Sequence, residues 1–133
     1  MLEIRKRTVE DIQVLEIKGR ILLGESSGML RSSLDELIRA GQSKILLDLE
    51  GVDYIDSSGL GALVMMATAV QKAGGQLVLL NLSKRNIELM VMTKLSTVFE
   101  IYNNETDAVN SFFPDRKVHK FDILNFVRGQ QEK

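Results

Sequence analysis

Two short apolar runs on either side of a long helical segment constrain the fold of this chain more than any other feature. Residues 44–49 (KILLDL) and 77–80 (LVLL) are nearly continuous apolar runs, which are typical of strands covered on both faces. Residues 57–73 between them are long and apolar enough for a helix, which Gly74 and Gly75 would end. A helical crossover between two buried strands predicts that these strands pair in parallel.

The rest of the chain extends this pattern. Residues 2–8 and 11–18 are predicted strands joined by a tight turn, so they should form an antiparallel pair at one edge of the sheet. Gly19 is expected to end the second strand, and residues 50–56 are expected to form a loop. The other predicted elements are helices at residues 25–40, 83–94 and 104–112 and a strand at residues 98–101. The predicted order is ββαβαβαβα, a single α/β domain with a mixed, mostly parallel sheet of about five strands and about four helices.

The predicted domain occupies residues 1–113, and Pro114, the only proline, should end its last helix. Residues 114–133 form a C-terminal extension in which charged and apolar residues are mixed. A disordered end and a short element that docks on the body, or on a second copy of the chain, remain alternatives for it. The single histidine, His119, lies in this extension and is expected to be solvated.

Composition narrows the class of protein. Seventeen basic and eighteen acidic residues give a net charge of −1, and aromatic residues make up only 5% of the 133 positions. Direct binding of nucleic acid is therefore not expected. The absence of cysteine rules out disulfides and thiolate metal sites. No apolar run is long enough to span a membrane, and the N-terminus lacks the apolar region of a secretory signal. We expect a cytoplasmic protein whose partners are proteins.

The most specific segment is D-S-S-G-L-G, residues 56–61, at the start of the predicted central helix. Asp56 or Ser57 can cap this helix by accepting a hydrogen bond from a free backbone N–H. Gly59 and Gly61 each cost up to roughly 1 kcal/mol relative to alanine inside a helix, which suggests that something approaches the backbone closely there. A well-capped helix with no further role is the simpler alternative.

The central helix carries an uncharged outer side. Its predicted sheet-facing stripe consists of Leu60, Leu63, Val64, Ala67 and Val70. The opposite side is made of Gly61, Ala62, Met65, Met66 and Ala69. Because a surface helix normally presents charges, this side is either covered by a neighbouring helix or is a surface to which another protein docks.

The run I-D-S-S-G-L-G, with the D-L-x-x-V strand and loop before it, resembles the phosphorylation segment of bacterial anti-sigma factor antagonists, which are single STAS domains. The resemblance extends over roughly residues 1–112. It includes Gly74-Gly75 before a Leu-Val-Leu-Leu strand, and Met92-Thr93-Lys94-Leu95 where the family often has M-S-G-L. The resemblance implies a regulatory binding module that is not an enzyme and that holds no cofactor or metal of its own.

The resemblance also implies a mechanism and a set of site residues. Ser57 would accept a phosphate from the cognate anti-sigma factor, which is a serine kinase, and Ser58 is the rival acceptor. The unphosphorylated antagonist would bind this kinase and release the sigma factor, and a metal-dependent Ser/Thr phosphatase would reset the phosphorylated form. A homodimer is a further candidate assembly. The residues expected to contact the partner are Asp56, Ser57, Ser58, Gly59, Gly61, Ala62 and Met65.

One departure from the family pattern keeps a second function open. Related antagonists often carry G-x-L-D after the second strand, and here Leu22 stands at the acidic position, which puts kinase recognition in question. The alternative is a STAS module that is not phosphorylated and serves a lipid-transport complex or a signalling assembly.

Catalytic readings fit the sequence less well. Neither Ser57 nor Ser58 lies in G-x-S-x-G, so a nucleophile elbow is not expected. Asp48, Asp53 and Asp56 suggest a Mg²⁺ site or a phosphoacceptor aspartate, but they fall on a strand, a loop and a helix start.

Overall fold

The computed structural model describes residues 2–22, 24–123 and 125–127. Five strands form one sheet in the order β1-β2-β3-β4-β5. The strands are β1 (Leu2–Val9), β2 (Ile12–Ile21), β3 (Lys44–Ile55), β4 (Gln76–Leu80) and β5 (Glu100–Tyr102). The helices of the described residues are α1 (Glu25–Arg39), α2 (Ser57–Lys72), α3 (Lys84–Met92), α4 (Glu105–Asn110) and the 3₁₀ helix η1 (Leu95–Thr97). The predicted order of strands and α-helices is confirmed.

The pairing of the strands follows from the connections between them. β1 and β2 are joined by the short turn at Glu10 and Asp11 and pair antiparallel, as predicted. β2, β3, β4 and β5 pair in parallel, because a helical crossover links each strand to the next. The mixed, mostly parallel sheet is therefore confirmed, with its antiparallel pair at one edge.

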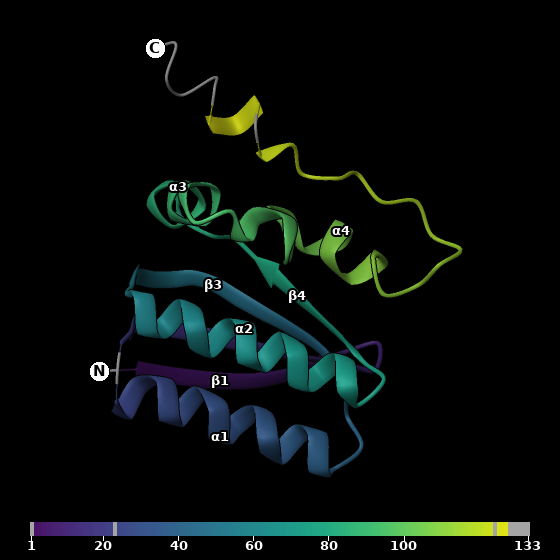
Figure 1. Cartoon of the computed structure of the whole chain (residues 1–133). Helices are drawn as coiled ribbons and strands as arrows, with labels where there is room; N and C mark the ends of the chain where they lie inside the picture. Colours follow the sequence, from purple (N-terminus) through teal and green to yellow (C-terminus); the bar gives the residue numbers. More distant parts are fainter. Residues whose placement is uncertain (1, 23, 124, 128–133) are drawn as a thin grey trace.

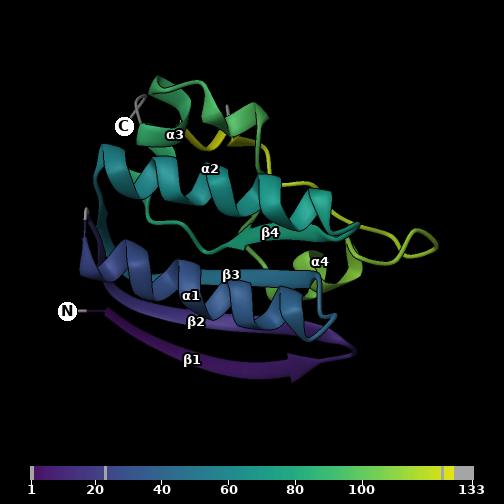
Figure 2. The same ribbon diagram turned by 60° about the horizontal axis from the view of Figure 1, so that its bottom comes forward.

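Helices cover the two faces of the sheet unequally. α1 and α2 run side by side in the same direction over one face, and α4 lies on the other (Figure 1, Figure 2). Successive strand residues point to opposite faces, so Leu47 and Leu49 join the core beneath α1 and α2, whereas Leu46 joins a smaller core beneath α4. Because α1 and α2 run in the same direction, their first turns lie at the same end of the molecule (Figure 1).

The expected loop at residues 50–56 is wrong, because β3 continues to Ile55. The strand stays paired with β2 through two register shifts, one between Glu16 and Lys18 and one between Gly19 and Arg20. A Cβ at Gly51 would lie 2.6 Å from Lys18 Cγ, so only glycine allows the two strands to approach this closely. The turn-like composition of this segment reflects an irregular strand pair.

Gly19 was also misassigned as a strand end. It adopts φ 115° inside β2, next to a register shift, and the strand continues to Ile21. The last predicted strand begins two residues later than expected because η1 occupies Leu95–Thr97. Neither boundary could be predicted from local composition, because composition does not reveal the register shift at Gly19 or the short 3₁₀ helix before β5.

The described residues beyond Pro114 contact the body of the chain. Phe121, Ile123, Phe126 and Val127 pack, partly buried, against the core beneath α1 and α2. Arg116 donates hydrogen bonds to both carboxylate oxygens of Glu10, in the β1–β2 turn, and its guanidinium carbon lies 3.9 Å from the centroid of the Phe113 ring. Figure 1 shows this segment returning past α4 to α3. Residues 124 and 128–133 of the expected extension lie outside the described residues.

Candidate partner-binding site

The site begins where β3 passes into α2. Asp56 follows the strand in an extended conformation, and its Oδ1 accepts a hydrogen bond from the backbone N–H of Gly59 at 2.7 Å. Of the two predicted caps, Asp56 is therefore the one that the structure uses. Ser57 is the first residue of α2 and is exposed, whereas Ser58 is half-buried. The helix start thus presents the hydroxyl-bearing Ser57 at the surface.

Gly59 fixes α2 to the end of β2. The residue is buried, and a Cβ built on it would lie 2.3 Å from the carbonyl oxygen of Ile21. The same carbonyl accepts a hydrogen bond from the backbone N–H of Asp56 at 3.2 Å. The predicted close approach to the backbone at Gly59 comes from this chain itself. Gly59 is buried against β2 in the isolated chain, and its contact with a partner stays a prediction.

The outer side of α2 is divided between core and surface. Gly61 is exposed with open space beside it, and the Met65 side chain is 52% exposed. Met66 is only 2% exposed and belongs to the core, so at this position the side of α2 opposite the predicted stripe is covered, which is one of the two alternatives that the sequence left open. Ala62 is half-buried. On α1, exposed Gly28 and Met29 (41% exposed) extend the uncharged surface, which the sequence did not single out.

Leu22 contributes mainly its backbone. Its N–H donates to the hydroxyl oxygen of Ser26 at 2.8 Å, and that hydroxyl donates back to the Leu22 carbonyl at 3.0 Å. Gly24, at the N-cap position of α1, makes no side-chain cap hydrogen bond, so this clasp by Ser26 orders the start of α1. The apolar side chain of Leu22 is half-buried.

A hollow of about 310 Å³ borders Ser57 on the side of α3. The residues that line it are Tyr54, Ile55, Asp56, Ser57, Arg85, Glu88, Leu89 and Met92. Met92 is 81% exposed, and the guanidinium of Arg85 lies 4.5 Å from the centroid of the Tyr54 ring. The α3 residues of this half of the site were not among the predicted partner contacts. The i, i+3, i+4 and i+7 spacing of the four α3 residues was the available signal.

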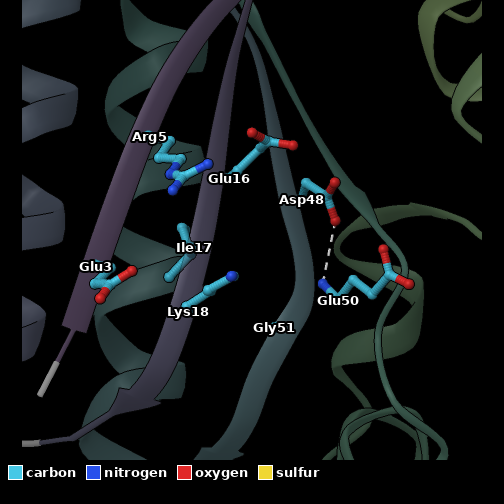
Figure 3. A pocket seen from close by; sticks show the side chains of 8 residues that line it. All are labelled: Glu3, Arg5, Glu16, Ile17, Lys18, Asp48, Glu50 and Gly51. Carbon is cyan, nitrogen blue, oxygen red and sulfur yellow. Dashed lines mark hydrogen bonds between the residues drawn. The ribbon is translucent and has the colours of Figure 1, made fainter.

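A second hollow, of about 270 Å³, lies on the open face of the sheet (Figure 3). Its side chains alternate in charge across the β1–β2 register, with Arg5 opposite Glu16 and Glu3 opposite Lys18. Opposite charges on facing strands stabilise the sheet locally. Asp48 accepts a hydrogen bond from the backbone N–H of Glu50 in the same hollow, on the face of β3 turned away from α1 and α2. This arrangement serves the sheet and lies apart from Ser57.

The remaining candidate residues do not converge. Asp48 lines the open face of the sheet, Asp53 is exposed, and Asp56 caps α2. Among residues 2–22, 24–123 and 125–127, no group of three or more His, Cys, Asp or Glu side chains is arranged to hold a metal ion. The backbone N–H of the exposed His119 donates to Asp107 in α4. No helix in the described part of the chain has the length and apolar character needed to cross a membrane.

Comparison with known proteins agrees with this geometry. The STAS domain family model matches residues 3–108. The anti-sigma-B factor antagonist of Bacillus subtilis is 40% identical over 96 residues, which cover 72% of this chain and 85% of that protein.

Two solved structures share the fold. The crystal structure of an anti-sigma factor antagonist from Mycobacterium paratuberculosis superposes with a TM-score of 0.75 at 17% identity, covering 84% of this chain and 94% of the other. The phosphorylated form of the Bacillus cell fate determinant SpoIIAA superposes with a TM-score of 0.63 at 18% identity, covering 82% of this chain and 98% of the other. With its ββαβαβαβα order and its D-S-S-G-L-G helix start, this chain belongs to the STAS-domain family of anti-sigma factor antagonists.

Proposed function

We propose that this protein is a phosphorylation-controlled antagonist of an anti-sigma factor. In its unphosphorylated form it binds a cognate anti-sigma factor that is also a serine kinase, and phosphorylation of Ser57 releases that partner. A metal-dependent Ser/Thr phosphatase restores the binding form. The observation that carries this proposal is the exposed Ser57 at the start of α2, beside the exposed and uncharged Gly61 and Met65.

The relatives support this assignment. The Bacillus subtilis relative is named as an antagonist of an anti-sigma factor, and the SpoIIAA structure is that of a phosphorylated form. By analogy with these relatives, we infer that the protein regulates transcription in the cytoplasm through contacts with other proteins and that it catalyses no reaction of its own. Contacts with the partner would involve Asp56, Ser58 and Ala62 in addition to Ser57, Gly61 and Met65.

The chemistry of the helix start explains why phosphorylation would act as a switch. A phosphoryl group adds roughly −1.5 to −2 charges at neutral pH. At the N-terminus of a helix this charge is favourable by about 0.3–1 kcal/mol, so the domain itself stays folded. In a closely packed interface, an uncompensated charge costs about 3–5 kcal/mol. Since each 1.4 kcal/mol or so changes the affinity tenfold, the interface loses its binding energy while the fold survives.

Binding of two Ser57 variants tests this proposal. We expect Ser57→Ala to bind the partner kinase constitutively in the presence of Mg-ATP, and Ser57→Asp to bind at least about tenfold more weakly by calorimetry. Thr106→Asp is the matched control, because it adds the same charge at an exposed position in α4, on the opposite face of the sheet. Phosphopeptide mapping distinguishes Ser57 from Ser58. Equal affinities of the wild type and a folded Ser57→Asp variant would contradict the proposal.

Leu22 favours one second candidate, a STAS module that is not phosphorylated. The half-buried leucine stands where related antagonists often carry an acidic side chain. Such a module would bind its partners in a lipid-transport complex or a signalling assembly regardless of charge at Ser57. Absence of phosphate on Ser57 and Ser58 after incubation with the partner kinase and Mg-ATP, together with unchanged binding by Ser57→Asp, would favour this candidate.

A further inference from the structure

The hollow beside Ser57 has one basic residue among the described residues that line it. Arg85 reaches it from the first turn of α3, and Ser57 and Tyr54 border it from the other side. Two acidic side chains, Asp56 and Glu88, line the same hollow. A phosphoryl group in this hollow would therefore lie near two carboxylates that repel it. The guanidinium of Arg85 is the one positively charged group among the described lining residues that attracts it.

The donors of Arg85 are not committed to a carboxylate. Within the described residues, no Asp or Glu oxygen lies within 4.0 Å of its guanidinium nitrogens. Glu88, which shares the hollow, instead lies 3.9 Å from Lys84 Nζ. The guanidinium lies over the Tyr54 ring, with its central carbon 4.5 Å from the ring centroid. Stacking on an aromatic face orients the planar group and leaves its N–H donors at the rim for another acceptor.

We infer that Arg85 binds the phosphoryl group of phosphorylated Ser57 and holds it in this hollow. This inference rests on the proposed function, since it requires a phosphate on Ser57. Two parallel N–H donors of a guanidinium match two phosphate oxygens, a pairing that a lysine cannot reproduce. The hollow, at about 310 Å³, is far larger than the space of one water molecule, so its volume is sufficient for a phosphoryl group.

The placement has a consequence for the partner. A phosphate drawn toward Arg85 brings its charge next to Met92, the most exposed of the large apolar side chains in the described part of the chain. The surface that responds to phosphorylation then includes α3 as well as the outer side of α2. Arg85 is thus a positioning residue: it does not transfer the phosphate, but it determines where the added charge lies.

The second pKa of the phosphate reports this contact directly. Phosphoserine is incorporated at position 57 of the full chain by genetic encoding, so that no kinase is needed, and the phosphate is titrated by ³¹P NMR. In the wild-type background we expect the guanidinium to favour the dianion, and Arg85→Gln to raise the second pKa of the phosphate by about 0.5 or more. Arg85→Lys should give an intermediate value, because it keeps the charge and loses the fork.

Two other residues supply controls. Lys72→Gln removes a positive charge at the exposed last residue of α2, which does not line the hollow, so it should shift this pKa much less. Glu88→Gln removes a negative charge from the hollow and should shift the pKa in the opposite direction from Arg85→Gln. Amide NMR spectra establish that each variant is folded. If Arg85→Gln does not fold, the inference is tested with the other two variants: Arg85→Lys should raise the second pKa of the phosphate and Glu88→Gln should lower it.

Identical titrations in the wild type and Arg85→Gln, or equal effects of Arg85→Gln and Lys72→Gln, would overturn the inference. This result is separable from the proposed function. Failure of a partner kinase to phosphorylate Ser57 would sink the proposed function and leave the titration of the encoded phosphoserine unchanged. Release of the partner by phosphorylation with no effect of Arg85 would sink only the inference.

Discussion

Gly59 in the first turn of α2 lies directly against the carbonyl oxygen of Ile21, the last residue of β2, at a separation that leaves no room for a Cβ. The backbone N–H of Asp56 donates to the same oxygen. One carbonyl therefore holds both the cap and the first turn of the helix. The position of Ser57, between Asp56 and Gly59, follows from this contact, because the residues on either side of it are fixed to the sheet.

The two glycines of the motif should respond in opposite ways to alanine. In Gly59→Ala the new Cβ would meet a backbone oxygen at 2.3 Å, and we expect a loss of about 1–3 kcal/mol in the free energy of unfolding. In Gly61→Ala the methyl group enters open space, and the higher helix propensity of alanine should add about 0.5–1 kcal/mol. Urea unfolding followed by circular dichroism measures both. Equal stabilities would contradict the assignment of Gly59 to packing.

The Asp56 cap predicts a graded loss of stability. Asp56→Ala removes the acceptor of the Gly59 N–H and should lower the free energy of unfolding by about 1 kcal/mol. Asp56→Asn keeps an acceptor oxygen and loses only the negative charge near the helix start, which is worth about 0.3–1 kcal/mol. Thermal unfolding should therefore rank Asn between Asp and Ala. A loss in Asn as large as that in Ala would mean that the charge, and not the cap, supports the helix.

The order of the elements was predictable because each strand and helix carries its own apolar period. The cap at Asp56 and the strand run at residues 44–49 are local signals that do not depend on distant contacts. The extension of β3 to Ile55 could not be seen this way. It depends on the fit of Gly51 against Lys18, residues far apart in the sequence, and on a partner strand whose register shifts twice.

The candidate site was predictable in part for the same reason. The D-S-S-G-L-G motif placed Ser57 at a helix start, which is where it lies. The burial of the methionines on α2 depends on how neighbouring elements pack, and helical spacing alone did not show that Met66 would be covered and Met65 exposed. Arg85 was missed because its relation to Ser57 arises from the position of α3 next to the junction of β3 and α2, where Asn86 of α3 donates a hydrogen bond to the carbonyl of Val52 in β3.

Adjacent methionines on α2 separate the effects of core and surface. Met66 is 2% exposed, so Met66→Ala should lower the free energy of unfolding by about 2–5 kcal/mol. Met65 is 52% exposed, and Met65→Ala should change stability by less than about 0.5 kcal/mol. Partner binding is expected to show the complementary result, with weaker binding by Met65→Ala in a fully folded protein. A large stability loss in Met65→Ala would place that side chain in the core.

An ion pair between Arg116 and Glu10 joins the C-terminal segment to the β1–β2 turn. Arg116 donates to both Glu10 oxygens, at 2.8 and 3.0 Å, and these hydrogen bonds hold the pKa of the Glu10 carboxyl below its usual range. A depressed folded-state pKa means that the stabilisation is present above the unfolded-state pKa and is lost as the pH falls through the folded-state value. Arg116→Gln should therefore return the Glu10 pKa toward its usual range in an NMR titration. It should also speed amide exchange in residues 116–123 at neutral pH, with little difference from the wild type in acid. Lys117→Gln removes the same charge one position away and should change neither, so an equal response to the two variants would exclude a specific Arg116–Glu10 contact.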